Sequence, residues 1–511
     1  MQSINQEIDN ARIDLFHHFS ENQTKSYSSR KHLLSQLKQS LENHTSNIVQ
    51  SLQSDLNRCE FQAYLCEINN LKNNIDHHLR NLKAWMSKEP LDFPLALMPG
   101  SNYVRHEPLG VVLVLGSWNF PFATTLNPVI GALAAGNCVL VKPSEVSQSC
   151  SKVIKQILDE LPSEVVHCLE GGPEVAQQLL LLRWDLICFT GSSEKGKLVA
   201  EAAAKHLTPT ILELGGKNPA ILDTNVDLEV AVMRILQGRF INCGQICLAP
   251  EMALVPFEIV ESFLTKCKEV SNEYFGEDPQ VSSDLGRMVN EFHTKRVLKL
   301  IENSGGEVVL GGTGSVESRY IAPTIILNPD LDSAISKEEV FGPVLLVYTY
   351  KTLEECIAFI KEREKPLSMY FFGKDKKVKE QLETETSSGS FSWNDCIVNY
   401  SCFDLPFGGT GSSGSSRIFG KYGFIAMSNQ KGVMEKSLFN KFPINLRYPP
   451  HTLQKFKNIQ RLAVSHTKQS LKELLKVLAV LAAVCFLVKK GHLKSLVKVP
   501  KAFLKFFNVR I

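Results

Sequence analysis

The sequence lacks the cysteine spacing of a disulfide framework. Its 13 cysteines are an odd number, and no two of them form a CxxC pair. Small secreted domains usually carry an even number of cysteines, so this pattern is typical of a protein from a reducing compartment. Only Cys243 and Cys247, in the stretch GRFINCGQICLAP, lie as close as four positions apart. These two are candidates for metal ligands, for a redox pair, or for one nucleophile beside an unrelated thiol.

The first thirty residues lack an apolar run, so we expect no secretory signal. The sequons at Asn22 and Asn43 are then expected to stay unmodified. The chain also lacks internal repeats and low-complexity linkers. With 511 residues, 44% hydrophobic and 21% charged, it has the composition of a globular protein of two or three domains.

The formal net charge of +3 hides an uneven distribution. From His451 to the end there are 13 lysines and arginines against one acid, Glu473, a balance of +12 that leaves −9 on the first 450 residues. A basic tail on an acidic body favours attraction to phosphate, on lipid or on nucleic acid.

The tail also contains apolar stretches. Residues 477–488 are uncharged and would form about 18 Å of helix, which is shorter than a hydrocarbon core of about 30 Å. The helix could extend back past Lys472 and Lys476, because the charged ends of these side chains can reach the membrane surface while their stems lie in the apolar region. Residues 493–507 place apolar side chains on one helical face and lysines on the other, with a kink expected at Pro500. Such a helix is typical of a membrane interface, and a docking helix for a partner protein is the alternative.

Short apolar runs alternate with helical stretches in the body of the chain. Residues 1 to about 90 have the spacing of helices with one apolar face. From Leu109, short apolar runs that end in Gly, Pro or Ser recur in LGVVLVLG, CVLVKPSE, EVVHCLEGG, LICFTGSSEKG and PTILELGG. Unbroken apolar runs are typical of strands that are buried on both faces. The alternation predicts an α/β fold with a doubly wound parallel sheet, and a second α/β region after Gly216.

A zinc site at Cys243 and Cys247 would need further ligands. No second cysteine pair completes it, and His206 and His293 belong to no HxxxH pattern. A redox pair would need exposure and usually CxxC spacing. We therefore expect no metal, and the default for the other cysteines is a small buried hydrophobe.

The surroundings of Cys247 favour a nucleophile. FINCGQIC ends 34 residues after Glu213 in ILELGGKN. GSWNFPF, GALAAGNCVLVKPSE, FTGSSEKGK, LELGGKNPAI, FINCGQICLAP, EEVFGPV and LPFGGTGSSG follow one another between residues 116 and 414. This ordered set resembles that of the NAD(P)-dependent aldehyde dehydrogenases over roughly residues 5–450. AAAKHLTP, GGTGSVESRYIAPTII and LRYPP resemble the class 3 branch, and the apolar tail is similar to that of its fatty aldehyde dehydrogenases.

The resemblance implies three catalytic residues. Cys247 would be the nucleophile, because a thiolate adds to an aldehyde and leaves a thioester after hydride loss. A free thiol has a pKa of about 8.5, so the site must raise the thiolate fraction or supply a base. Glu213 would be that base and would also activate the water that hydrolyses the thioester. Asn119 would hold the oxyanion together with the backbone N–H of Cys247, although an asparagine before Pro121 could instead cap a helix.

The resemblance also implies a cofactor site. FTGSSEKG, between a strand and a helix, offers backbone N–H groups to a pyrophosphate, although it lacks the GxGxxG form. A carboxylate at Glu145 would repel a 2′-phosphate, so we expect NAD, with NADP possible. The implied cofactor residues are Trp118, Lys142, Glu145, Gly191, Ser192, Gly196, Leu214, Glu339 and Phe341.

The sequence departs from the family pattern at two places. Lys195 stands where the family usually has an apolar residue beside the adenine. Ser415 and Ser416 replace the usual Met and Gly after GSSG. Neither departure is expected to touch the reacting atoms.

The resemblance implies a Rossmann-like cofactor domain, a second α/β catalytic domain and a small oligomerisation segment. The predicted boundaries are 1–85 with 108–213 for the NAD-binding domain, 214–390 for the catalytic domain, 86–107 with 391–445 for oligomerisation or bridging, and 446–511 for a membrane-associating tail. A homodimer is expected, through the segments beginning near Trp85 and after Gly389.

The sequence therefore predicts an enzyme that oxidises long-chain aliphatic aldehydes to acids with NAD. The alternatives are a catalytically silent binding or structural protein with this fold, and a dehydrogenase of medium-chain or aromatic aldehydes. We expect no nucleic-acid partner. The expected location is the cytosolic face of the endoplasmic reticulum membrane, with the cytoplasm or another intracellular membrane as alternatives.

Overall fold

The computed structural model describes residues 2–94 and 97–462, which form two compact units. The first unit takes the residues up to 87 and residues 106–429, and the second takes residues 88–105 and those from 430 onward. Every catalytic and cofactor residue predicted above therefore belongs to the first unit.

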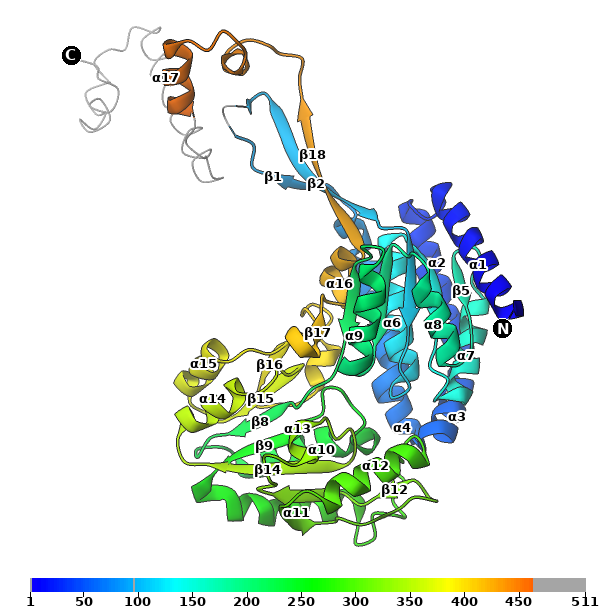
Figure 1. Cartoon of the computed structure of the whole chain (residues 1–511), viewed down its shortest axis with the longest axis vertical. Helices are drawn as coiled ribbons and strands as arrows, with labels where there is room; N and C mark the ends of the chain where they lie inside the picture. The colour runs from blue at the N-terminus through cyan, green and yellow to red at the C-terminus, as the bar shows by residue number, and fades with distance from the viewer. Residues whose placement is uncertain (1, 95–96, 463–511) are drawn as a thin grey trace, which may run out of the picture. The chain divides into compact units, whose positions relative to one another are not determined.

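A six-stranded sheet of the first unit has the order β17-β7-β6-β3-β4-β5. Its two edge strands, β17 and β5, are labelled in Figure 1. All neighbouring strands are parallel except β17, which pairs antiparallel with β7. The strands are β3 (Val111–Leu115), β4 (Cys138–Lys142), β5 (Val166–Cys168), β6 (Leu186–Thr190), β7 (Thr210–Glu213) and β17 (Gly414–Ser415). The doubly wound parallel sheet predicted from the apolar runs is confirmed.

Helices cover both faces of this sheet because the central strand β3 is apolar at every position. Val111 and Leu113 pack in one core, and Val112 and Val114, on the opposite face, pack in another. The first core takes in α1 (Gln2–Ser20), α8 (Pro173–Leu181) and α9 (Ser193–Ala204). The second takes in α2 (Tyr27–Asn43), α3 (Thr45–Leu56), α5 (Asn69–Trp85), α6 (Pro121–Ala135), α7 (Gln148–Asp159) and α16 (Gly420–Ala426). The short helix α4 (Glu60–Ala63) and a π-helical turn (Tyr64–Ile68) join α3 to α5.

A seven-stranded sheet follows in the same unit, with the order β10-β13-β14-β9-β8-β15-β16. Only β10 is antiparallel to its neighbour. The strands are β8 (Pro219–Leu222), β9 (Met252–Pro256), β10 (Glu307–Leu310), β13 (Thr324–Leu327), β14 (Val344–Tyr350), β15 (Ser368–Phe372) and β16 (Ser390–Trp393). A separate small hairpin joins β11 (Gly314–Ser315) to β12 (Tyr320–Ile321).

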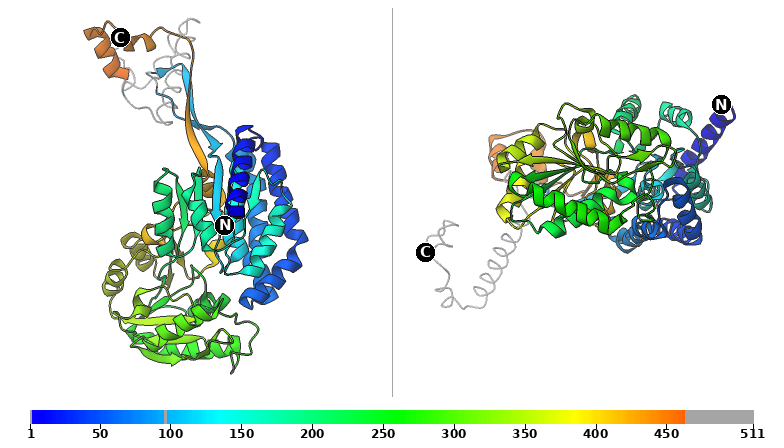
Figure 2. Two further views of the ribbon diagram at one scale, coloured as in Figure 1. Left: turned by 45° about the vertical axis from the view of Figure 1, so that its right-hand side comes forward. Right: turned by 90° about the horizontal axis from the view of Figure 1, so that it is seen from below.

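This second sheet also lies between two layers of helices, as the view from below in Figure 2 shows. One layer is α10 (Leu228–Phe240) and α11 (Val260–Phe275). The other is α12 (Glu291–Glu302), α13 (Ala334–Lys337), α14 (Leu353–Lys361) and α15 (Lys376–Glu385). The second α/β region expected after Gly216 is thus present.

A three-stranded sheet in the order β1-β2-β18 lies mostly in the second unit, while the end of β2 and the start of β18 belong to the first. The strands of this sheet are β1 (Glu89–Leu91), β2 (Gly100–Pro108) and β18 (Ser428–Lys436). In the described part of the second unit, a short turn of helix (Ile444–Arg447) and α17 (Leu453–Leu462) follow β18. Most residues of β18 are exposed. The four-part division of the chain stays a prediction; β17 comes from the stretch assigned to bridging but pairs with β7.

The predicted membrane-associating tail lies outside the described residues from residue 463 onward. Within the part of the chain that is described, no helix combines the length and the apolar character needed to cross a membrane.

Candidate active site

A left-handed turn carries the chain from α10 to Cys247. Asn242, Cys243 and Gly244 have φ of 53°, 54° and 71°, a backbone conformation that ordinary residues rarely adopt. A side chain at Gly244 would place its Cβ 2.2 Å from the carbonyl oxygen of Gly342. Glycine is therefore required, because the turn passes directly against another segment of the backbone.

Buried amide side chains hold this turn in place. Asn242 Nδ2 donates to the carbonyl oxygens of Asn119 (3.0 Å) and Gln245 (3.2 Å). Gln245 Nε2 donates to the carbonyl of Asn242 (3.0 Å), and its Oε1 accepts from Val289 N–H (2.9 Å). Because these side chains satisfy backbone groups that the irregular turn leaves unpaired, they fix the path of the loop before Cys247.

The left-handed turn separates Cys243 from Cys247. Cys243 is fully buried in a core of the second sheet, and Cys247 is half-buried and packs against a core of the first. A spacing of four would place two residues on one face of a regular helix, and this backbone is not one. Among the described residues, no group of three or more His, Cys, Asp or Glu is arranged to hold a metal ion.

Asn119 points to the loop before Cys247. It is 4% exposed, its Nδ2 donates to Gln245 O at 3.0 Å, and its Oδ1 accepts from Ser117 Oγ at 2.6 Å. Helix α6 has Phe120 as its N-cap with no side-chain capping bond, so Asn119 does not cap it. A side-chain amide carries two N–H donors, which leaves one beside the loop.

A buried ion pair that the sequence did not reveal supports both Asn119 and the turn. Arg58 Nη1 and Glu67 Oε1 are 2.7 Å apart, with both side chains fully buried. Arg58 also donates to Asn119 O (2.6 Å) and to Asn242 Oδ1 (3.2 Å), and Glu67 accepts from the N–H of Ala123 (2.7 Å). These contacts span up to 184 positions, so no local pattern could have indicated them.

Glu213 ends strand β7 as a buried carboxyl without a hydrogen-bond partner. It is 5% exposed, and neither side-chain oxygen is bonded. Burial raises the pKa of Glu213 well above its ordinary value, and the charge of Arg417 opposes this. A Cβ on Gly408 would lie 3.0 Å from Glu213 Oε1, so the glycine loop lines the carboxyl.

The Cys247 thiol lies within electrostatic reach of two carboxyls. Burial raises its pKa to about 12, and the charges of Glu339 and Glu213 add to the increase. Hydrogen bonding by the N–H groups of Cys247 and Leu248 lowers it. A thiol in this setting is protonated at neutral pH, so reaction requires a base that removes its proton.

The predicted cofactor residues gather at the carboxyl edge of the first sheet. Lys142, at the end of β4, is 4% exposed and donates to Glu145 Oε2 at 2.6 Å. Gly191 follows β6, and its N–H donates to Glu213 O at 3.1 Å. Ser192 caps α9 by accepting from the N–H of Lys195 at 3.4 Å. A Cβ on Gly196 would fall 2.8 Å from Leu214, so the first turn of α9 packs closely against the end of β7.

Glu339 and Phe341 reach this region from the second sheet. The Glu339 carboxyl lies against Gly215, where a Cβ would come within 2.1 Å of its Oε2. Burial and the charge of Glu251 raise the pKa of Glu339 to about 8. Phe341 has a φ of 50°, and its ring meets that of Trp118 edge to face at 5.3 Å between centroids.

These groups fit a dinucleotide. The carboxyl edge of a parallel sheet, together with a helix N-terminus, is where such molecules bind. Lys142 and Glu145 offer polar groups beside β4, and Gly196 allows the close approach of α9 that a side chain would prevent.

A comparison of the sequence with models of protein families identifies the family of this chain. Residues 3–433 match the model described as the aldehyde dehydrogenase family. The chain belongs to the aldehyde dehydrogenase family.

The similarity of this aldehyde dehydrogenase to related proteins supports the same family. It is 38% identical to aldehyde dehydrogenase family 3 member A2 of Rattus norvegicus over 89% of this chain and 94% of the rat protein. It is also 38% identical to the dimeric NADP-preferring aldehyde dehydrogenase of Canis lupus familiaris over 88% of this chain and 98% of the dog protein. The predicted enzyme class, an aldehyde dehydrogenase that uses NAD(P), is confirmed.

Solved structures share the fold. The substrate-bound Staphylococcus aureus AldH has a TM-score of 0.86 and 37% identity, over 89% of this chain and 99% of that one. A Mycobacterium tuberculosis aldehyde dehydrogenase complexed with NAD+, at 24% identity, has a TM-score of 0.76 over 84% and 90% of the two chains. The roles of individual site residues in this aldehyde dehydrogenase stay predictions.

The departure at Ser416 has a structural consequence. Ser416 has a φ of 69°, in the region that glycine tolerates better than serine. Ser416→Gly should therefore stabilise the fold by about 1 kcal/mol, seen as a higher melting temperature. Ser415→Gly is the matched control, because Ser415 lies in β17 opposite Leu212 and glycine in a strand destabilises. Equal effects of the two substitutions would contradict the account.

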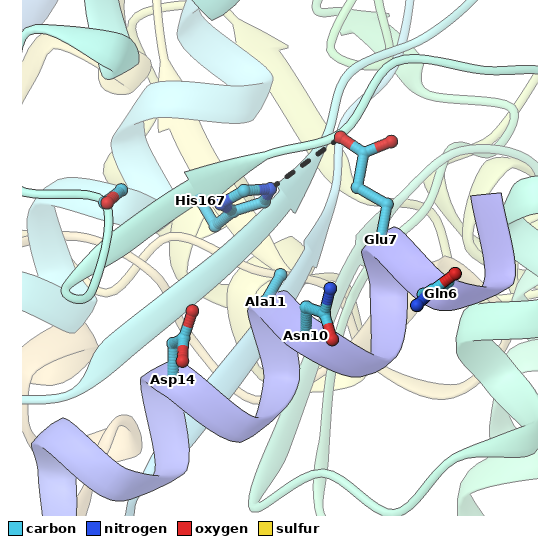
Figure 3. Close-up of a pocket in the computed structure, with 7 residues that line it drawn as sticks. Gln6, Glu7, Asn10, Ala11, Asp14 and His167 are labelled. Carbon is cyan, nitrogen blue, oxygen red and sulfur yellow. Dashed lines mark ion pairs between the residues drawn. The ribbon is translucent and has the colours of Figure 1, made fainter. Parts of the chain in front are cut away.

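A surface hollow of about 380 Å³ shares no residue with this site (Figure 3). It lies beside α1, where Glu7 Oε1 is 4.0 Å from His167 Nε2. Its lining is Gln6, Glu7, Asn10, Ala11, Asp14, Ser163 and His167.

Proposed function

We propose that this enzyme oxidises long-chain aliphatic aldehydes to carboxylic acids with NAD, at a membrane surface. The observation that carries the proposal is the basic, apolar tail on an intact aldehyde dehydrogenase site. An apolar aldehyde partitions into a bilayer, so an enzyme held there meets its substrate at high concentration. Glu145 favours NAD over NADP, because a carboxylate at this place would repel a 2′-phosphate.

The first step uses three residues of the chain. Glu213, once ionised, takes the proton of the Cys247 thiol, and the thiolate adds to the carbonyl carbon of the aldehyde. The second N–H of Asn119 Nδ2 and the N–H of Cys247 then stabilise the oxyanion of the thiohemiacetal, each worth on the order of 3 kcal/mol. NAD, when bound at the carboxyl edge of the first sheet, would supply the acceptor for the hydride that the thiohemiacetal carbon loses, and this loss leaves the thioester on Cys247.

The second step releases the acid from the thioester on Cys247. Glu213, once it has released the thiol proton to solvent, removes a proton from water, the resulting hydroxide adds to the thioester carbonyl, and the carbon–sulfur bond breaks. The carboxylic acid leaves, and the sulfur regains its proton. Water rather than coenzyme A is the acceptor in this proposal, so the product is a free acid.

A series of aldehyde chain lengths tests the substrate class. NADH production from the purified full-length enzyme should give a kcat/KM that rises from hexanal to hexadecanal and exceeds that for benzaldehyde. A preference for medium-chain or aromatic aldehydes would replace the proposal with that alternative. No NADH from any aldehyde would favour a catalytically silent protein.

The tail carries a separate prediction. Truncation after Pro450 removes α17, which packs on the turn Ile444–Arg447, and everything beyond it. The truncated enzyme should no longer sediment with membranes but should oxidise short aldehydes at an unchanged rate. Membrane binding that persists, or a loss of folding, would contradict the assignment of the tail as an anchor.

We further propose a homodimer on the cytosolic face of the endoplasmic reticulum. The class 3 resemblance supports both parts, and the dog relative is named as dimeric. Sedimentation velocity of the truncated enzyme and fractionation of cells that express the full chain test them separately.

A further inference from the structure

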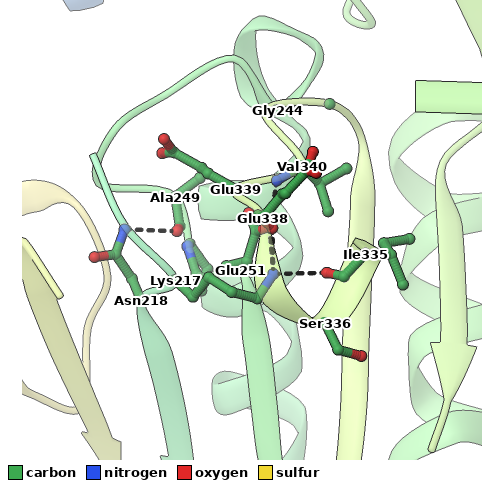
Figure 4. Close-up of polar contacts among 12 residues, drawn as sticks. Lys217, Asn218, Gly244, Ala249, Glu251, Ile335, Ser336, Glu338, Glu339 and Val340 are labelled. Carbon is green, nitrogen blue, oxygen red and sulfur yellow. Dashed lines mark hydrogen bonds and ion pairs between the residues drawn. The ribbon is translucent and has the colours of Figure 1, made fainter. Parts of the chain in front are cut away.

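A buried carboxylate joins two parts of the candidate site. Glu251, just before β9, is 2% exposed. Its Oε2 accepts from Arg239 Nη1 at 2.8 Å. Its Oε1 accepts from Lys217 Nζ at 3.0 Å and from the N–H of Val340 at 2.6 Å, and Figure 4 shows these residues together. Glu251 thus binds the segment that contains Glu339 and two cations from elsewhere in the second α/β region.

Arg239 extends this network to the nucleophile loop. It lies in the last turn of α10 and is 1% exposed. Its Nη2 donates to the carbonyl oxygens of Gly244 and Gly342, both at 2.5 Å. Gly244 lies three residues before Cys247, and Gly342 lies three residues after Glu339. One nitrogen therefore bridges the loop of the nucleophile and the segment of Glu339.

Each of the two segments that Arg239 joins is also held by other hydrogen bonds. Lys217 Nζ donates to the carbonyls of Ile335 and Glu338, both at 2.8 Å, and Arg296 donates to that of Val340 at 2.5 Å. On the other side, Asn242 and Gln245 hold the loop. Both segments therefore keep their local shape without Arg239, and what Arg239 adds is the spacing between them.

We propose that Arg239, held by Glu251, is a positioning residue that sets the distance between Cys247 and the cofactor-binding segment at Glu338–Gly342. This rests on the proposed roles of Cys247 and Glu339. A buried ion pair contributes little net stability compared with apolar packing. We therefore attribute the pair of Arg239 and Glu251 to the spacing that it fixes between the two segments. A misplacement of about 1 Å between reacting groups costs about 100-fold in rate.

Arg239→Met in the full-length enzyme tests the proposal. We expect kcat to fall about 100-fold and the dissociation constant for NAD, measured by calorimetry, to rise about tenfold. NAD should also change the alkylation rate of Cys247 by iodoacetamide, followed by mass spectrometry of its peptide, in the unsubstituted enzyme but not in the variant. A merely structural role would lower the yield of folded protein without changing kcat per titrated site.

Two further variants complete the experiment. Arg234→Met is the matched control on the same helix; Arg234 contacts Asn394 O and Asp395 at the surface, so all three measurements should stay unchanged. Arg239→Lys keeps the charge without the forked geometry and should recover part of each loss; it replaces Arg239→Met if that variant does not fold.

The outcomes distinguish this inference from the proposed function. Unchanged kcat, NAD affinity and alkylation response in a folded Arg239 variant would overturn the positioning role. No NADH from the unsubstituted enzyme would overturn the proposed function, and the calorimetry and alkylation would still decide whether Arg239 couples the two segments.

Discussion

Cys247→Ser should abolish NADH production from hexadecanal, with a loss on the order of 10⁴-fold or more. A serine hydroxyl is a far weaker acid than a thiol, and the base available to it is the same Glu213. The variant should still bind NAD with normal affinity, because the substitution removes only the nucleophile. Initial rates by absorbance and NAD binding by calorimetry measure the two properties separately.

Cys243→Ser is the control for this experiment. Cys243 is fully buried in an apolar core, so serine there should lower the melting temperature and leave the kcat of the folded enzyme close to normal. Equal catalytic losses at the two positions would favour the thiol redox or zinc interpretation. Substantial activity of Cys247→Ser would remove Cys247 from the mechanism.

Glu213→Gln should lower steady-state turnover by roughly 10²- to 10⁴-fold. The glutamine has a similar shape but cannot accept a proton from the thiol or from water. The small thiolate fraction that exists without this base should still form the thioester slowly, and because hydrolysis also needs the base, that thioester should accumulate. Glu194→Gln, an exposed carboxylate at the start of α9, is the control and should keep full turnover.

The pH dependence follows from the buried state of Glu213. Burial raises its pKa, so the carboxyl is protonated and cannot act as a base until the pH exceeds that raised value. The rate of the unsubstituted enzyme should therefore rise with pH, by up to tenfold per pH unit below this pKa. The rate should level off above the pKa of Glu213. Glu213→Gln should lose this plateau, because its remaining rate follows the Cys247 thiolate, whose pKa is about 12, and a profile identical to that of the unsubstituted enzyme would exclude Glu213 as the titrating group.

The sequence predicted the first sheet well because its strands are buried on both faces. The run Val111–Leu115 is apolar at each position, and such a run has few alternatives to a central strand of a parallel sheet. The catalytic candidates were found through motifs, and Glu213, Asn119 and Cys247 do lie in one unit of the structure.

What could not be predicted depends on contacts between distant parts of the chain. The ion pair joins Arg58, in the loop between α3 and α4, to Glu67 in the π-helical turn, and Asn242, which Arg58 also contacts, is 184 positions away from it. A spacing of four would place Cys243 and Cys247 on one face of a regular helix, but Gly244 permits a left-handed turn that separates them. Likewise, no local pattern indicated that Gly414–Ser415 pairs with β7.

The central claim is that Cys247 carries the acyl group and Glu213 releases it. Mass spectrometry of Glu213→Gln, incubated with hexadecanal and NAD and digested under mildly acidic conditions, tests it most directly. The account predicts one hexadecanoyl group on the peptide that contains Cys247, formed together with one equivalent of NADH. NADH without an acyl group on that peptide, or an acyl group on another cysteine, would contradict it.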